Sequence, residues 1–295
     1  MSLTLTIQIL LGILSIYFIY IFINDLIHHK NKIKDGNIFI AITIGFVVNF
    51  FDALGIGAYA TTALSLKLTH FLKNDKLLPG TLNTSSVLPV IFEAFLFITS
   101  IKLGGTTLLS LIIAATIGAF LGSKIMTKFD EKRIQVVMGC ALIITAILIT
   151  LQNSGVIKGL GTGNATALTG WKLAAGIICN FILGILMTAG VGLYAPCMAM
   201  VYLLGLTPIS AFPIMMASSA FLIPVASREF IRKDQYNRIA TIGITLGGLV
   251  GILIAVNFVK NLSVKLLTWL VVIVIFYTAI MMLFQGIKRF NSSLS

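Results

Sequence analysis

Two acidic side chains stand inside long apolar stretches of the sequence, where an ionised carboxyl group is costly. Asp52 lies in "FFDALGIGAYATT" and Glu93 lies in "VIFEAF". An aspartate at the centre of a membrane helix costs about 2.5–3.5 kcal/mol, and an apolar environment favours its neutral form. We therefore expect Asp52 to couple proton movement to substrate movement, with Glu93 as a second proton carrier. The alternative is a hydrogen-bonded structural carboxyl, or one at the edge of a wet cavity.

Paired glycines occur twice in similar surroundings. Gly55 and Gly57 open "GIGAYA", and Gly190 and Gly192 open "GVGLYA". Glycines that break a helix inside a membrane leave half-helix N-termini, whose free N–H groups and positive dipole attract anions. The alternative is close packing of helices, which small residues also permit. The repetition favours broken helices around an anion site.

Small polar side chains follow each glycine pair at a similar distance, in "LNTSS" and "ASSA". Neutral donors bind an anion reversibly, as a transporter needs, although such hydroxyls also bond to their own helix. A tyrosine near each glycine pair is either a packing aromatic or a further hydroxyl donor. The candidate contacts are Asn83, Thr84, Ser85, Ser218, Ser219, Tyr59 and Tyr194.

Residues for enzymatic chemistry are missing from the sequence. His28, His29 and His70 lie in basic stretches away from the serines, which argues against a Ser/His hydrolase. No cluster has the spacing of metal ligands, and no phosphate-binding GxxxxGK[ST] motif occurs. The three cysteines lie in apolar runs without CxxC spacing. We expect no enzyme activity, no cofactor and no metal.

The composition explains which elements must hold these residues. The chain has 295 residues, of which 58% are hydrophobic and 10% charged, whereas ordinary soluble domains are about 45–50% apolar and about 25% charged. Long apolar runs recur along it, which predicts an all-α polytopic membrane protein. The net charge of +12 falls mostly in short loops, so it indicates topology rather than nucleic-acid binding. The predicted apolar segments are 3–27, 37–51, 53–66, 78–101, 106–123, 134–151, 171–188, 190–205, 210–226, 239–259 and 266–285.

Positive charge orients these segments across the membrane. The basic stretches include "HHKNKIKDG", "KIMTKFDEKR" and "REFIRKDQYNR", which we place in the cytoplasm. The N-terminus is then outside and the C-terminus cytoplasmic, in the cell inner (plasma) membrane. Each glycine-broken pair of segments forms a hairpin that returns to its own side. The first segment lacks the features of a cleaved signal and is expected to stay as a helix.

The two halves of the chain match each other. A shift of 135 residues places "GIGAYA" on "GVGLYA" and Pro89 on Pro224, and a shift of 129 places "TIGAFLG" on "TLGGLVG". Each half contains a hairpin and three further spans, and this odd number of crossings inverts the second copy. Two inverted-topology repeats are a transporter architecture. The expected parts are an N-terminal helix and basic loop (1–36), a first repeat (37–151), an extracytoplasmic linker (152–170) and a second repeat (171–295).

With these motifs, residues 37–285 resemble the sulfite exporter family typified by TauE and SafE, also called the four-toluene-sulfonate uptake permeases. Members carry a glycine-rich turn followed by a "VP" pair in each half, and then a small-hydroxyl motif. Here Ala195-Pro196 stands at the second "VP" position, while Thr61 replaces the proline in the first half. The resemblance implies Pro196 as a site residue and secondary transport of small sulfur-containing or organic anions, such as sulfite or sulfonates.

The sequence leaves other functions open. A passive anion channel would use the same architecture. A cation permease would use Asp52 and Glu93, which are the only acids well inside apolar runs. A membrane enzyme or an assembly factor is disfavoured, since catalytic clusters, soluble domains and long loops are missing. The expected partners are a small anion, the lipid bilayer and protons, with no nucleic acid.

Overall fold

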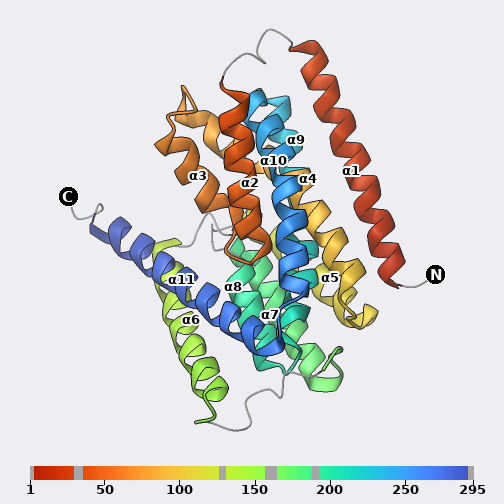
Figure 1. Ribbon diagram of the computed structural model, residues 1–295, viewed down its shortest axis with the longest axis vertical. Coiled ribbons are helices and arrows are strands. Elements are labelled where there is room, and N and C mark those ends of the chain that lie inside the picture. The colour runs from red at the N-terminus through yellow and green to blue at the C-terminus, as the bar shows by residue number, and fades with distance from the viewer. Residues whose placement is uncertain (1–2, 30–35, 126–130, 157–164, 188–192, 292–295) are drawn as a thin grey trace. The chain divides into compact units, whose positions relative to one another are not determined.

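The fold is helical throughout the residues that a computed structural model of the chain describes, which are 3–29, 36–125, 131–156, 165–187 and 193–291 (Figure 1). The helices are α1 (Leu3–His28), α2 (Ile38–Ala53), α3 (Ala58–Leu68), α4 (Leu78–Ser100), α5 (Gly105–Ile125), α6 (Glu131–Asn153), α7 (Gly170–Met187), α8 (Tyr194–Leu203), α9 (Ala211–Arg232), α10 (Arg238–Lys260) and α11 (Val264–Asn291). Within this described part, eight helices are long and apolar enough to cross a membrane. The prediction of a helical protein with many membrane-spanning segments is confirmed at that level.

Helices α3 and α8 are too short to cross a bilayer. They have 11 and 10 residues. At about 1.5 Å per residue this length covers about half of a hydrocarbon core that is roughly 30 Å thick. Both stand where the sequence predicts the second arm of a glycine-broken hairpin.

The chain divides into two compact units. The first unit contains Met1–Ser100 and Ser219–Lys260, and the second contains Ile101–Ser218 and Asn261–Ser295. Each unit therefore combines helices from both halves of the sequence. Helix α9 contributes residues to both.

In the first unit, α2 and α10 run side by side with almost no space between their backbones (Figure 1). A Cβ atom added to Gly45 would overlap the backbone carbonyl of Ile244, and one added to Gly247 would overlap that of Ile42. The contact is reciprocal: Gly45 lies three residues after Ile42, and Gly247 lies three residues after Ile244. Only residues without a side chain permit this approach.

In the second unit, α5 and α7 make the same reciprocal contact. A Cβ atom added to Gly184 would overlap the backbone carbonyl of Ala115, and one added to Gly118 would overlap that of Phe181. The three-residue spacing between each glycine and the contacted carbonyl on its own helix is the same as in the first unit. Helices α6 and α11 pack along each other in the same unit.

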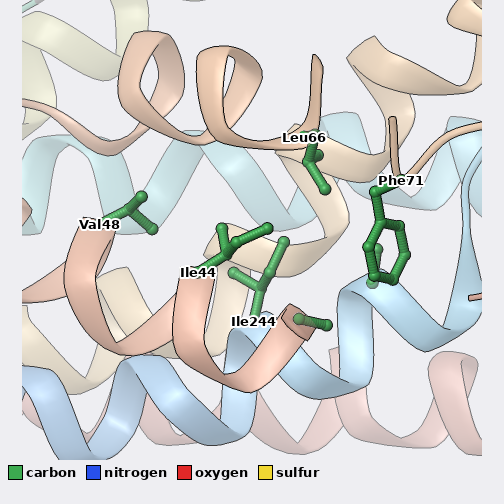
Figure 2. Close-up of a cluster of buried hydrophobic side chains, with 7 residues drawn as sticks. Ile44, Val48, Leu66, Phe71 and Ile244 are labelled. Atoms are coloured by element: carbon green, nitrogen blue, oxygen red, sulfur yellow. The ribbon is translucent and has the colours of Figure 1, made fainter. Parts of the chain in front are cut away.

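A hydrophobic cluster ties the far end of α3 to α2 and α10. It contains Ala41, Ile44, Val48, Leu66, Phe71, Ala240 and Ile244, and Figure 2 shows the cluster with Ile44, Val48, Leu66, Phe71 and Ile244 labelled. Leu66 lies near the end of α3 and Phe71 follows it in the loop. The end of α3 that lies away from Gly57 is therefore packed against α2 and α10.

Candidate functional site

The turn between α2 and α3 breaks the helix at the predicted glycines. Gly55 has a φ of 95° and Gly57 a φ of 91°, values that side-chain-bearing residues rarely adopt. Helix α2 ends at Ala53 and α3 begins at Ala58. The chain is therefore broken between α2 and α3 at the two glycines.

Only part of the second hairpin can be compared with the first. Gly190 and Gly192 lie outside the described residues. Tyr194 begins α8 and is half-buried, and Pro196 is buried in the first turn of that helix. A proline is tolerated there because the first turn has no intrahelical partner for its nitrogen.

Asp52 stands in the last turn of α2, directly before the break. Its side chain is 1% exposed, and the backbone N–H of Ala58 donates a hydrogen bond to its carboxylate. The oxygen Oδ1 has no hydrogen-bond partner. Since Ala58 is the first residue of α3, the carboxylate lies against the positive end of that helix. Asp52 thus caps α3 from the preceding helix.

Glu93 lies in α4 and has no exposed surface. Neither of its carboxyl oxygens has a hydrogen-bond partner. Asp52 is near enough for its charge to act on Glu93 and on Tyr59. An ionised carboxylate without hydrogen bonds is very costly in an apolar interior. The structure therefore brings the two predicted acids into electrostatic contact.

Tyr59 and Asn83 link α3 to α4. The hydroxyl of Tyr59 donates to Oδ1 of Asn83 at 3.0 Å. The Asn83 amide donates to the carbonyl of Pro79, one turn earlier, at 2.9 Å. Asn83 is therefore held in one orientation beside the α3 hydroxyl. Tyr59, Asn83, Asp52 and Glu93 form what we call the acid site.

Thr84 and Ser85 face α10. The hydroxyls of Thr84 and Thr241 lie 2.8 Å apart, and Thr84 also bonds to the carbonyl of Gly80. The Thr245 hydroxyl donates to the carbonyl of Ser85 at 3.3 Å. Pro89 leaves this carbonyl without its usual intrahelical donor. The hydroxyl of Thr84 and the backbone carbonyl of Ser85 thus hold α4 against α10, while the hydroxyl of Ser85 donates to the carbonyl of Leu82 on its own helix.

Ser218 and Ser219 differ from the other hydroxyl residues. Both are buried in α9, and neither hydroxyl has a hydrogen-bond partner. Ser227, on the same helix, bonds to the carbonyl of Ile223 in the usual way. Buried hydroxyls without a partner are available to a ligand, so the predicted role of these two serines stays open.

Asn49 is a polar residue that the sequence reasoning missed. It is 1% exposed on α2, and its amide donates to the carbonyl of Gly45 while its Oδ1 has no partner. It precedes Asp52 by three residues and therefore lies on a neighbouring part of the same helix face. The signal was present in the sequence as an amide inside the apolar stretch "VVNFFD".

A buried ionic cluster corrects the interpretation of one basic stretch. Arg238 was expected in a cytoplasmic loop, yet it is 3% exposed and forms two hydrogen bonds with the carboxylate of Asp25. Asp25 is itself buried in α1, so Asp52 and Glu93 are not the only acids inside apolar segments. Tyr236 donates its hydroxyl to the same carboxylate. Burial raises the pKa of Tyr236, and the bond to Asp25 raises it further.

Among the described residues, no three His, Cys, Asp or Glu side chains lie together in a group that could hold a metal ion. Cys140, Cys179 and Cys197 are free, and only Cys197 is buried. Comparison of the chain with protein-family models, with curated proteins and with solved structures finds no match.

Proposed function

We propose that the chain is a secondary membrane transporter of small anions, with alternating access between two inverted repeats and proton coupling through Asp52 and Glu93. The substrate class, sulfur-containing or organic anions such as sulfite and sulfonates, comes from the resemblance to the TauE/SafE family. We also propose the multi-pass inner-membrane location, with the N-terminus outside and the C-terminus in the cytoplasm.

The observation that carries the proposal is the acid site beside a broken helix. Two fully buried carboxyl groups, Asp52 and Glu93, have oxygens without partners and act on each other electrostatically. Such groups are rare in membrane segments and mark ion paths and proton relays. A structural role would predict partners for all of these oxygens.

The reciprocal glycine contacts support the repeat architecture. Gly118 corresponds to Gly247 by the shift of 129 that aligns "TIGAFLG" with "TLGGLVG". Gly45 corresponds to Gly184 by a shift of 139, four residues from the shift of the hairpins. Four residues are about one helical turn, so the same face of the helix is kept. A duplicated and inverted ancestor accounts for both contacts.

The test is transport by the purified protein in liposomes, recorded as current on a solid-supported membrane. Sulfite, thiosulfate, sulfoacetate, taurine, acetate and chloride are offered with and without a pH gradient. We expect a saturable current for a sulfur anion that the pH gradient alters. Ser218→Ala and Asn83→Ala should reduce it, whereas Ser227→Ala, whose hydroxyl bonds to its own helix, serves as the matched control.

Other outcomes would change the proposal. Anion flux that neither saturates nor responds to a pH gradient would indicate a passive channel. A cation permease is the second candidate, because the partnerless oxygens of Asp52 and Glu93 suit a hard cation. Current carried by cations, with no response to any anion, would make that candidate the better one.

A further inference from the structure

We infer that Asp52 is an internal competitor for the substrate: it occupies an anion subsite at the N-terminus of α3, and a substrate anion binds there by displacing it as Asp52 takes up a proton. This inference rests on the proposed function and gives it a mechanism of coupling.

The N-terminus of α3 has no other source of negative charge within its own sequence. The helix has 11 residues, its first turn contains no acidic residue, and Gly57 at the N-cap supplies no side chain. The Thr61 hydroxyl donates to the carbonyls of Gly57 and Ala58, so these bonds do not use the N–H groups of the first turn. Asp52 fills this position through the N–H of Ala58. A helix end that binds one carboxylate has the geometry to bind another small anion.

The second observation is the imbalance between acceptors and donors around Asp52. Its oxygen Oδ1 is buried without a partner, and both oxygens of Glu93 are also buried without partners. Two carboxyl groups that interact cannot both ionise cheaply, so at least one proton is held between them. With that proton on Glu93, an ionised Asp52 needs a further proton from solution before an anion can take its place.

Besides burial, the protonation of Asp52 depends on its interaction with Glu93. The titratable neighbours are Tyr59 on α3 and Glu93 on α4. Helix α10, which packs along α2, has charged side chains only at its ends, Arg238 and Lys260. Among the described residues, no cationic side chain is one of the groups that act on Asp52.

Charge balance links the two binding events. An ionised Asp52 and a substrate anion repel each other and compete for the same N–H group. When Asp52 takes a proton from water, the N–H of Ala58 becomes free and the repulsion ends. The anion then replaces the carboxylate as the acceptor, and the net charge of the site is unchanged. One proton accompanies each anion.

The test uses methanesulfonate, which stays ionised over the whole working range, so that every proton taken up belongs to the protein. Binding to the purified full-length protein is measured by calorimetry in buffers of different ionisation enthalpy. For the wild type we expect uptake of about one proton per anion and an affinity that falls about tenfold for each pH unit above the transition. Asp52→Asn should bind with no proton uptake and with little dependence on pH.

Two further variants make the result specific. Glu93→Gln should still take up a proton, because Asp52 remains, and Glu229→Gln, at an exposed position, should match the wild type. Anion binding without proton uptake in the wild type would overturn the inference and leave the transporter standing. Proton uptake that persists in Asp52→Asn but disappears in Glu93→Gln would overturn it as well. Failure of methanesulfonate, sulfite and acetate to bind at all would overturn the proposed function itself.

Discussion

The helix pairs α2/α10 and α5/α7 meet through the same glycine geometry, but only the first pair continues into a carboxyl group. Gly45 and Gly247 contact backbone carbonyls in one pair, and Gly184 and Gly118 do so in the other. At the position 135 residues after Asp52 stands Met187. The glycine packing is thus present in both pairs, whereas the acid is present in one. Helix packing alone therefore does not require Asp52.

Each helix pair also contains a buried asparagine, and the two amides donate their hydrogen bonds to different helices. Asn49 donates to a carbonyl of its own helix, at Gly45. Asn180 donates across to the carbonyl of Leu111 on α5, at 2.7 Å. The Asn180 amide therefore joins two helices, whereas the Asn49 amide bonds within its own helix, and the Oδ1 atom of each residue is buried without a partner. The asparagine of the second pair thus holds two helices together, whereas that of the first pair lies on α2 three residues before Asp52.

The largest expected effect comes from the start of α10, which is held by a buried ion pair, whereas the start of α5 is held by neutral hydrogen bonds. Arg238→Met should lower the free energy of unfolding by about 3–5 kcal/mol, because the buried carboxylate of Asp25 loses its arginine partner and keeps Tyr236 and the partly exposed His29. Thr107→Val, which removes the acceptor of the Leu168 N–H bond, should cost about 1–3 kcal/mol. Thermal unfolding in detergent measures both.

A double variant distinguishes the contribution of the Asp25–Arg238 ion pair to stability from that of side-chain packing. Replacing both partners by apolar residues, Asp25→Leu with Arg238→Met, should recover much of the loss, since no unpaired charge is left. Equal losses for the single and double variants would mean that packing, not charge, holds α1 against α10.

The next effect tests whether the two glycine contacts are equivalent. Gly247→Ala and Gly118→Ala should each cost about 1–3 kcal/mol, because the new methyl group meets a backbone carbonyl that cannot move freely. Gly12→Ala on α1, where nothing lies within 4 Å, is the matched control. Thermal stability in the same detergent gives the comparison. A large loss for one variant and none for the other would contradict the equivalence of the pairs.

The helices and the first break were predictable from the sequence because the membrane leaves few choices. Apolar runs in lipid must satisfy their own backbone groups and so form helices. Gly55 and Gly57 were identifiable as a break because glycine readily adopts backbone conformations with positive φ, and both residues do so in the structure. Asp52 and Glu93 stood out because acids are rare in such runs. These inferences needed only local sequence and the properties of the bilayer.

The pairing of helices was not predictable in the same way. Asp25 and Arg238 are 213 residues apart, and each lies at the end of an apolar run where a charge is normally assigned to a loop. Thr84 was interpreted as a ligand because its partner, Thr241, is on a helix whose neighbours the sequence does not give. The capping of α3 by Asp52 was easier to predict from the sequence, because Ala58 follows Asp52 by six residues.

A smaller effect distinguishes the two asparagines. Asn180→Leu should lower the free energy of unfolding by about 1–3 kcal/mol, because the Leu111 carbonyl loses its cross-helix donor. Asn49→Leu should change stability less, because its bond lies within one helix, but it should reduce transport in the liposome assay. If Asn49→Leu impaired folding as strongly as Asn180→Leu and left transport per folded molecule unchanged, the proposed division of roles would be wrong.

The smallest effect at neutral pH is expected for Tyr236, whose hydroxyl, like Arg238, donates a hydrogen bond to the carboxylate of Asp25. Burial and the bond to Asp25 raise its pKa above the ordinary value of 10.0, so the folded state favours the protonated form. This contribution is fully present below about pH 10 and is lost as pH rises, because the unfolded chain then releases the proton first. Tyr236→Phe should cost about 1 kcal/mol near neutrality. It should also flatten the alkaline loss of stability relative to the wild type, measured by thermal unfolding between pH 8 and about pH 11. Parallel alkaline profiles for the two proteins would show that the hydroxyl does not hold its proton through Asp25.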